Sequence, residues 1–375
     1  MAKRKATGSA ARLIYASGER DADIYYATGL ATTDAYPYLK QGRRKVMFAS
    51  ALELSRARKD AKCAVEALAQ PRTDAEKKVG AISLMLRKRK IRSVTVPYDF
   101  PSGLAQKLQA NGIKVHAVGS PQFFPQRAIK SGREIRFIAR SQETAQQAVE
   151  QVVGLVAKAR ADGKGGLVLG GKPLTSEFLH EKAAMFLSAR GFDAGETIIC
   201  SGADSSMPHF RGSGRLYDNS QIVIDIFPKD KATRYFGDVT RTVFKGEPTG
   251  KFVRMYEAVR KVQQECLDRL HVGVTGAELY KHAADRFEKL GYRNTAGKGG
   301  FFGFNHNLGH GLGLDVHEEP RLSPTGGKLD AGNVVTIEPG LYYPKIGGIR
   351  IEDAVVVTKK GHRNLTRLPK ELQIL

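Results

Sequence analysis

Residues 221–243 read QIVIDIFPKDKATRYFGDVTRTV, which predicts two β-strands joined by a turn. Asp225 lies between two isoleucines in the first apolar run, and Asp238 directly precedes the second run. The residues at 228–231, PKDK, have the composition of a turn, so the two runs should pair as a hairpin. Because facing strands can direct both carboxylates to one point, we expect Asp225 and Asp238 to lie close together.

Asp225 needs a partner, because a carboxylate among apolar side chains is stable only when it is paired or bound to a metal. A second candidate segment lies further along the chain and is dense in glycine and histidine. Residues 305–320 read NHNLGHGLGLDVHEEP, and the glycines around His310 let the backbone approach a site closely. A flexible loop with incidental histidines is the alternative interpretation of this segment.

Two glutamates occur in apolar segments near the C-terminus. Residues 335–343 read VTIEPGLYY and place Glu338 between an isoleucine and a Pro-Gly turn. Residues 347–357 read GGIRIEDAVVV and place Arg350 and Glu352 on the same face of one strand. Either glutamate alone fits a partly buried ion pair, but their occurrence together with the other acids favours a shared site.

Five side chains of the kinds that bind metals therefore fall in separate short motifs. They are Asp225, Asp238, His310, Glu338 and Glu352. Four carboxylates and one imidazole form an oxygen-rich set that suits a pair of divalent ions. The same carboxylates without a cation would repel one another. The set indicates a hydrolytic enzyme with two metal ions.

The 375 residues should form two domains, an α/β domain at 1–122 and a catalytic domain at 127–375. Alternating strands and helices in the first domain predict a sheet covered by helices, with Thr73 or Asp74 capping one helix. The strands are predicted at 23–30, 45–50, 93–98 and 114–118, and the helices at 51–70, 73–90 and 104–112. In the second domain, helices are predicted at 132–161, 175–189, 250–270 and 275–290, and strands at 196–200, 221–227, 333–340 and 348–358.

Composition limits the function classes. The chain has 60 Lys and Arg against 38 Asp and Glu, and the net charge of +22 fits either nucleic-acid binding or a basic, solvated enzyme surface. The basic residues are spread along the chain without a nucleic-acid-binding motif, so no nucleic-acid partner is expected. No apolar run approaches the roughly 20 residues of a membrane span, and the N-terminus lacks the apolar region of a secretory signal. Three widely spaced cysteines favour the reducing cytoplasm.

The motifs also resemble a known family. The chain contains, in order, SGADSSMPHF, VIDIF, FGDVTRTV, LGHGLGLDVHEEP, TIEPGLYY and GGIRIEDAVVVT, as do the creatinase/aminopeptidase ("pita-bread") metallopeptidases. Residues from about 127 to 365 carry this resemblance, and residues 12–120 resemble the family's N-terminal domain more weakly, through DIYYATG. It implies a two-domain α/β protein, with a helix-covered sheet in an N-terminal α/β domain and a curved antiparallel sheet in a C-terminal α+β pita-bread domain.

The resemblance implies a role for each candidate metal ligand. Asp225 would bind one ion through both oxygens. Asp238 and Glu352 would bridge the two ions, and His310 and Glu338 would bind the second ion.

The resemblance also implies residues that act on the substrate. His209, in MPHF, and His317, in VHEEP, would hydrogen-bond the scissile amide and the tetrahedral intermediate. Glu338 would carry a proton to the leaving nitrogen, and Arg350 matches an arginine of the proline-directed branch of the family. Phe227 stands where the family usually has glycine, which bears on the shape of the substrate pocket.

The implied function is that of a metal-dependent exopeptidase, resembling Xaa-Pro dipeptidases and proline aminopeptidases. It would hydrolyse Xaa-Pro bonds through a hydroxide shared by two divalent ions, expected to be Mn²⁺, with Co²⁺ or Zn²⁺ as alternatives. Its substrate would be a peptide with proline at the second position, and the enzyme would be a cytoplasmic homodimer. Two alternatives remain: a hydrolase of the same fold that acts on another amide or ester, and a non-catalytic binding protein with a basic surface.

Overall fold

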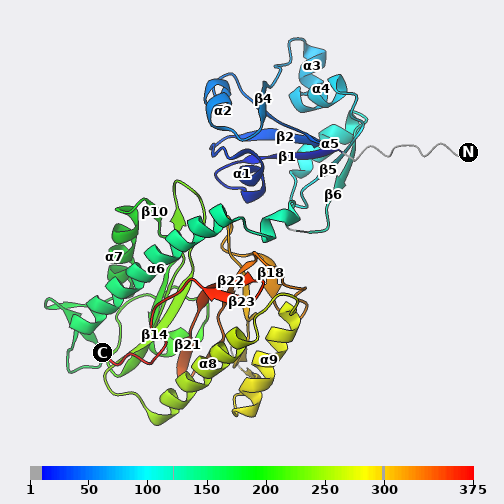
Figure 1. The fold of residues 1–375 in the computed structure, drawn as a ribbon. Coiled ribbons are helices and arrows are strands. Elements are labelled where there is room, and N and C mark those ends of the chain that lie inside the picture. The colour runs from blue at the N-terminus through cyan, green and yellow to red at the C-terminus, as the bar shows by residue number, and fades with distance from the viewer. Residues whose placement is uncertain (1–10, 121, 298–299) are drawn as a thin grey trace, which may run out of the picture. The chain divides into compact units, whose positions relative to one another are not determined.

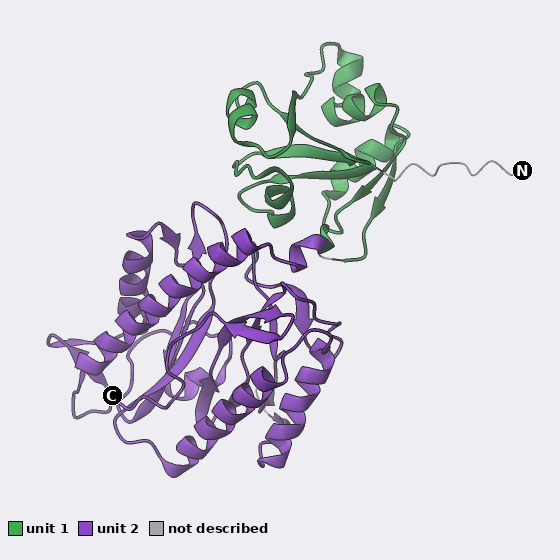
Figure 2. Ribbon diagram, viewed as in Figure 1, with its two compact units in different colours: residues 1–125 green, residues 126–375 purple. Residues whose placement is uncertain are grey.

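The computed structural model describes residues 11–120, 122–297 and 300–375. It divides into two compact units (Figure 2): unit 1 ends at Pro125, and unit 2 runs from Gln126 to Leu375. Among the described residues, we find no helix with the length and apolarity that spanning a bilayer requires.

Unit 1 is built on a six-stranded mixed sheet with the order β4-β3-β2-β1-β5-β6. The strands are β1 (Ala11–Ser17), β2 (Ala35–Gln41), β3 (Arg44–Ala49), β4 (Ala64–Ala67), β5 (Ser93–Val96) and β6 (Lys114–Ala117). β2 is antiparallel to β1 and β3, whereas β5 is parallel to β1 and β6. Side chains along β1 alternate between two cores, so that Leu13 lies in one and Ile14 in the other. Both faces of the sheet are therefore covered.

Helices pack against both faces of this sheet (Figure 1). They are α1 (Ala22–Thr28), α2 (Leu54–Asp60), α4 (Ala81–Lys88) and α5 (Ser102–Ala110). Helix α3 (Asp74–Val79) has no buried residue and contacts α4. Ile24 of α1 and Ala57 of α2 belong to one core, and Leu86 of α4 and Leu108 of α5 belong to the other. The helix-covered sheet is confirmed, as are the strands predicted at 45–50, 93–98 and 114–118 and the helix predicted at 104–112.

The prediction of a strand at 23–30 was wrong, because most of these residues form helix α1. The Asp21 side chain caps the helix by accepting the Ile24 N–H at 2.6 Å. The helix ends at Gly29, whose N–H donates to the Tyr25 carbonyl. The isoleucine and tyrosines favoured a strand, but a side-chain cap at one end and a glycine at the other outweigh that preference.

Two predicted helices of unit 1 are shorter than expected. In the stretch 51–70, only α2 is helical, and Ala64–Ala67 forms the edge strand β4. The helix predicted at 73–90 is divided into α3 and α4 by Gly80, whose φ of +84° is incompatible with a continuous helix. Thr73 caps α3 as predicted, in a capping box with Glu76.

Unit 2 combines long helices with antiparallel strand ladders. Its helices are α6 (Gly132–Lys158), α7 (Ser176–Ser188), α8 (Gly250–Asp268) and α9 (Gly276–Lys289), and its short 3-10 helices are η1 (Pro125–Ala128) and η2 (Gly202–Ser206). The four α-helices confirm the four predicted ones. Throughout the part of unit 2 that the structure describes, the ladders between strands are antiparallel.

The strands of unit 2 form several small sheets. One sheet has three strands in the order β11-β12-β14, and another has five strands in the order β18-β17-β19-β22-β23. The bounds are β7 (Arg160–Ala161), β8 (Leu167–Leu169), β9 (Lys172–Pro173), β10 (Phe192–Asp193), β11 (Ile198–Ser201), β12 (Ser220–Ile226), β13 (Lys229–Asp230), β14 (Val239–Lys245), β15 (Thr295–Gly297), β16 (Gly300–Phe302), β17 (Gly309–Gly311), β18 (Glu318–Leu322), β19 (Val334–Ile337), β20 (Gly340–Tyr343), β21 (Gly347–Arg350), β22 (Asp353–Thr358) and β23 (Gly361–Asn364).

Two helix pairs cover different strand groups in unit 2. Helices α6 and α7 share a core with β11, β12 and β14, and helices α8 and α9 share another with β19, β21 and β22. Along β12, Ile222, Ile224 and Ile226 face the first core, so Asp225 must point to the opposite face. Strand periodicity thus turns the Asp225 carboxylate away from the α6–α7 core.

The hairpin predicted at 221–243 is confirmed, since β12 pairs antiparallel with β14 and Asp225 lies opposite Thr240. The strand predicted at 348–358 is instead divided. β21 pairs with β20, and β22 joins the five-stranded sheet. The chain changes sheets at Glu352, whose N–H donates to the Thr240 carbonyl at 3.1 Å. One backbone bond therefore ties Glu352 to the hairpin strand that follows Asp238.

Candidate metal centre

The five candidate metal ligands line one cavity of about 540 Å³. They come from β12, the start of β14, β17, the end of β19 and the break between β21 and β22. They are Asp225, Asp238, His310, Glu338 and Glu352. Glu338 is partly exposed, and the other four are buried. Segments more than 120 positions apart in the sequence thus supply one site.

Three of these residues lie close enough together to share one ion. One ligand atom each from Asp238, His310 and Glu352 falls within 4.8 Å of the others. His310 Nε2 lies 3.6 Å from Asp238 Oδ2 and 3.3 Å from Glu338 Oε1. The imidazole therefore lies between two carboxylates, and an imidazole nitrogen and carboxylate oxygens are donors that bind divalent metals.

The residues of the cavity fit divalent cations. Asp225 Oδ1 is buried and has no hydrogen-bond partner among the described residues, so this oxygen is free to bind an ion. Burial, and then the charges of the neighbouring carboxylates, raise the pKa of Asp238 and of Glu352 well above the ordinary range. Burial, and then His317, lower the pKa of His310 well below its ordinary value, which keeps the imidazole neutral. A cation would relieve the repulsion among these carboxylates and accept the neutral nitrogen.

Metal-free protein should lose stability as the pH rises from about 7 to about 8. Burial raises the pKa of Glu338 from 4.5 to about 8, so in this window the folded state holds a proton that the unfolded state has lost. Burial lowers the pKa of His306 and of His310 below 6.5, so both are neutral in the folded and unfolded states above neutral pH. Each buried carboxyl group whose pKa is raised in this way, as that of Glu338 is, should lower the free energy of unfolding by up to about 1.4 kcal/mol per pH unit.

Urea denaturation of chelator-treated protein at the two ends of this window checks the expectation. A divalent ion should abolish this decrease in the free energy of unfolding, because it binds the ionised carboxylates. Stability that is unchanged or rises over the window without metal would contradict the account of the cavity.

The two histidines predicted to contact the substrate also line the cavity. His209 and His317 occur in its lining with Arg350. The His317 ring packs edge-on against the His310 ring, with centroids 4.2 Å apart. Burial, and then the charge of Arg321, lower the pKa of His317, so it is uncharged at neutral pH. Both imidazoles line the cavity with the candidate ligands and so are placed to hydrogen-bond a substrate.

Arg350 contacts a candidate ligand directly. Its Nη2 donates to Asp225 Oδ2 at 2.6 Å, and its Nη1 donates to the Tyr342 hydroxyl at 2.7 Å. Its Nε donates to Thr240 Oγ1 at 3.1 Å, and Thr240 Oγ1 donates to Glu352 Oε2 at 2.8 Å. The guanidinium therefore orients Asp225 and, through Thr240, Glu352.

Tyr342 and Thr240 were not predicted as site residues, nor was His306. The Tyr342 hydroxyl lies 3.1 Å from His306 Nε2, which continues the chain of contacts that begins at Arg350. Burial, and then the charge of Arg350, lower the pKa of His306 to about 3. The sequence signal for Tyr342 was its place in VTIEPGLYY, four residues after Glu338, but only the structure brings its hydroxyl to Arg350.

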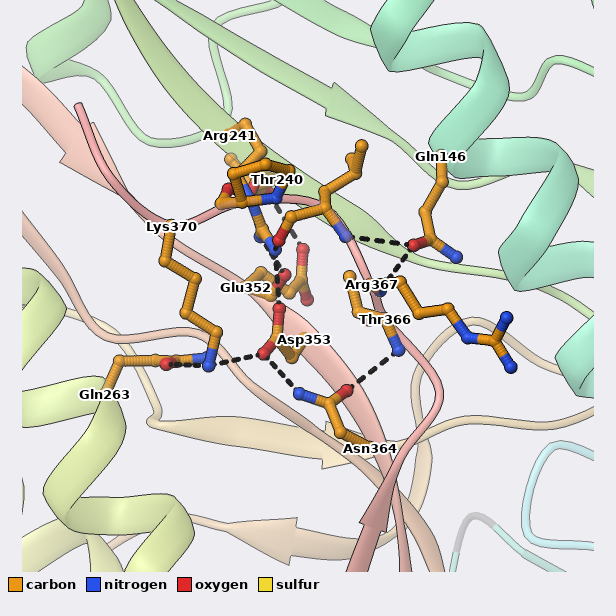
Figure 3. Close-up of polar contacts among 12 residues, drawn as sticks. Gln146, Thr240, Arg241, Gln263, Glu352, Asp353, Asn364, Thr366, Arg367 and Lys370 are labelled. Carbon is orange, nitrogen blue, oxygen red and sulfur yellow. Dashed lines mark hydrogen bonds and ion pairs between the residues drawn. The ribbon is translucent and has the colours of Figure 1, made fainter. Parts of the chain in front are cut away.

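A buried ion pair supports the centre (Figure 3). Arg241 and Asp353 directly follow Thr240 and Glu352 in the chain, and Arg241 Nη2 donates to Asp353 Oδ1 at 2.8 Å. Arg241 Nη1 also donates to the Glu352 carbonyl at 2.7 Å. Lys370 Nζ lies 2.8 Å from Asp353 Oδ2. These bonds hold the backbone of Glu352 while its side chain lines the cavity.

A second buried network borders His317. Arg127 Nη2 donates to Glu318 Oε2 at 2.6 Å and to Asp315 Oδ2 at 2.8 Å. Lys130 Nζ lies 2.7 Å from Glu318 Oε1. Because Asp315 and Glu318 flank His317, the two cations hold the loop that carries this histidine.

Comparisons with known proteins identify the family of this chain and proteins of similar structure. Residues 137–359 match the family model for metallopeptidase family M24. A Xaa-Pro dipeptidase of Pyrococcus horikoshii is 32% identical over 356 residues, which cover 94% of this chain and 92% of that protein. The crystal structure of the prolidase from Pyrococcus horikoshii OT3 superposes with a TM-score of 0.79 at 29% identity, over 97% of this chain and 95% of the other. A prolidase from Pyrococcus furiosus gives 0.78 at 26% identity, over 96% of each chain.

Buried carboxylates and a neutral histidine around one cavity form a donor set that suits divalent metal ions. The chain belongs to metallopeptidase family M24, because the family model matches more than half of its length. It is therefore a peptidase, and membership implies divalent metal ions. The family resemblance and the two-domain α/β fold with its pita-bread domain are confirmed. A non-catalytic binding protein is set aside.

Proposed function

We propose that this peptidase hydrolyses Xaa-Pro bonds with two divalent ions. The observation that carries the proposal is the convergence of five ligand-type side chains on one cavity that His209 and His317 also line. The relative from Pyrococcus horikoshii, called a Xaa-Pro dipeptidase, aligns over nearly its whole length and supports the substrate class. We assign catalysis to the domain at 127–375, and a non-catalytic role to the domain at 1–122.

The ligand assignment follows the resemblance and the donor chemistry. Asp225 would bind one ion, Asp238 and Glu352 would bridge the two, and His310 and Glu338 would bind the other. Four carboxylates favour an oxygen-preferring ion, so we propose Mn²⁺, with Co²⁺ and Zn²⁺ as alternatives. Bound there, such ions would polarise the substrate carbonyl and make water a nucleophile at neutral pH.

The chain's own residues supply the proton transfers and the orientation. Glu338 is the partly exposed carboxylate among the five candidate ligands, so it can exchange a proton with water and with a substrate in the cavity. We assign to Glu338 the proton delivered to the leaving nitrogen. A proline nitrogen has no N–H for an enzyme to hold, so this proton and the positioning of the ring must provide the selectivity.

The cavity has an apolar wall that could receive the proline ring. Ile198, Pro208, Phe227 and Val316 line it beside the candidate ligands. We propose that the pyrrolidine ring packs on part of this wall, because burying an apolar ring there removes it from water without unsatisfied polar groups. His209 and His317 would then hydrogen-bond the scissile amide.

We further propose that the enzyme acts in the cytoplasm as a homodimer. Cys63, Cys200 and Cys266 are all free thiols, as a reducing compartment would keep them. The dimer is implied by the family resemblance, and sedimentation of the purified chain would test it.

A substrate panel tests the proposed function. Chelator-treated protein would be loaded with Mn²⁺, Co²⁺ or Zn²⁺ and assayed on Xaa-Pro dipeptides, Xaa-Pro-Yaa tripeptides, matched Xaa-Ala peptides and a phosphate ester. Metal-dependent release of Xaa from the proline peptides, with little cleavage of the alanine peptides, is expected. Faster turnover of the ester or of the Xaa-Ala peptides would support the alternative of a related hydrolase with another substrate.

His317→Ala and His209→Ala should retain metal but lose about 10²- to 10⁴-fold in kcat, the range for a group that assists proton transfer or charge stabilisation. Neither imidazole belongs to the group that could share one ion, Asp238, His310 and Glu352. Metal analysis beside steady-state kinetics separates the roles. Loss of bound metal in His317→Ala would show that this histidine is a ligand.

A further inference from the structure

Asp238 lies where the ladder between β12 and β14 stops. The first paired residue of β14 is Val239, opposite Ile226, so Asp238 has no strand partner in that ladder. Both of its backbone polar groups are instead bound by the Gln142 side chain of α6. The Asp238 N–H donates to Gln142 Oε1 at 2.7 Å, and Gln142 Nε2 donates to the Asp238 carbonyl at 2.8 Å. One amide thus takes the place of a neighbouring strand.

The same amide connects Asp238 to the segment that follows Glu352. Gln142 Nε2 also donates to Thr366 Oγ1 at 2.9 Å. Thr366 Oγ1 accepts the N–H of Ala354, two residues beyond Glu352, at 3.0 Å. Gln142 is fully buried, so no water competes for these bonds. Two candidate ligands from distant segments therefore share one anchor on α6.

The contact between α6 and the Asp238 segment is close. A Cβ atom at Gly237 would lie 2.5 Å from the backbone of Ser141, the residue before Gln142. Only glycine allows this approach, which brings the Gln142 amide within reach of the Asp238 backbone. Helix α6 is itself fixed, since Ser131 and Glu134 form a capping box at its start. A rigid helix is a suitable support for a metal ligand.

We propose that Gln142 is a positioning residue of the metal centre, which sets the direction of the Asp238 carboxylate by holding both backbone polar groups of that residue. The inference rests on the proposed function, because it takes Asp238 as a metal ligand. Gln142 touches neither ion nor substrate and acts through Asp238. Hydrogen-bond partners of metal ligands usually change metal affinity or activity by about 10- to 100-fold when they are removed.

Gln146, one helical turn further along α6, is a matched control. Its Oε1 accepts the N–H groups of Arg367 and Leu368, at 2.5 Å and 3.2 Å (Figure 3). It is buried, as Gln142 is. Its Nε2 also donates to the carbonyls of Gln142 and Leu365, so it binds four backbone groups, and none of them belongs to a candidate metal ligand. Gln146→Met should therefore destabilise the fold about as much as Gln142→Met without loosening Asp238.

The test measures Mn²⁺ affinity and stability separately in the full-length chain. Mn²⁺ alone is titrated calorimetrically into chelator-treated wild type, Gln142→Met and Gln146→Met, and urea denaturation is followed without metal. Gln142→Met should raise the Kd for at least one Mn²⁺ by about 10- to 100-fold. Gln146→Met should stay within about threefold of wild type, although both variants unfold at lower urea concentrations.

Two results would overturn the inference. One is a Gln142→Met protein with wild-type Mn²⁺ affinity, and the other is an equal loss of affinity in Gln146→Met, which would make the effect one of general stability. If Gln142→Met does not fold, Gln142→Glu replaces it, because this variant removes the amide N–H groups and keeps the size of the side chain. A wild-type protein that binds no Mn²⁺ would instead overturn the proposed function.

Discussion

Asp238→Ala should remove bound metal and reduce kcat/KM by at least about 10³-fold, because divalent ions are what make water a nucleophile at neutral pH. Asp238 is 3% exposed and belongs to the group of three side chains that could share one ion. As a bridging ligand it would contact both ions, so its loss should affect both. Metal analysis after dialysis and kinetics on a Xaa-Pro dipeptide measure the two effects together.

Asp230→Ala is the control for this experiment. Asp230 is a buried carboxylate in the same connection between β12 and β14, but it pairs with Arg140 at 2.9 Å and does not line the cavity. It should lose stability and keep its metal. An Asp238→Ala protein that retained a full complement of metal and activity would show that Asp238 is a structural acid.

Arg241→Met should destabilise the protein by about 3–5 kcal/mol, the cost of removing one partner from a buried ion pair. The side chains of Arg241 and Asp353 are only 5% and 0% exposed, so water cannot replace the lost contact. Burial would raise the pKa of Asp353, but Arg241 and Lys370 lower it below its ordinary value, so the carboxylate stays charged. In the Arg241→Met protein, the Asp353 carboxylate keeps only its contacts with Lys370 and Asn364.

Urea denaturation measures this loss, with Arg260→Met as the control. Arg260 pairs with Glu257 on the surface of α8, where the two side chains are 41% and 47% exposed. Exposed pairs contribute little, so this variant should stay within about 0.5 kcal/mol of wild type. Equal stability of the two variants would mean that the Arg241–Asp353 pair does not support the metal centre.

Among the candidate ligands, the sequence signal is strongest for Asp225, because its environment has few explanations. Asp225 between two isoleucines must be neutralised, and the strand period that buries Ile224 and Ile226 turns its carboxylate the other way. The long helices of unit 2 were also predictable, because their apolar periodicity runs over many residues and caps such as Ser131 mark their starts. Strong local signals and tertiary structure agree in these cases.

The remaining features depend on contacts between distant segments. The helix at Ala22–Thr28 was missed because one capping contact decided a short element of mixed preference. Gln142 lies in no motif, and the motif that contains Tyr342 does not reveal its contact with Arg350, since both roles come from the groups that the fold brings to these side chains. The change of sheet at Glu352 follows from a hydrogen bond to Thr240, more than a hundred positions away. The spacing of residues along the chain does not reveal such contacts between distant segments.

Anomalous diffraction from Mn²⁺-loaded crystals tests the central claim most directly. The account predicts two peaks about 3.5–4 Å apart in the cavity, with donor atoms at roughly 2.0–2.3 Å. The donors should come from Asp225, Asp238, His310, Glu338 and Glu352. A single peak elsewhere, or a pair of peaks that leaves any of these five side chains more than about 8 Å away, would contradict the two-metal centre, since bond lengths and ion spacing do not allow it.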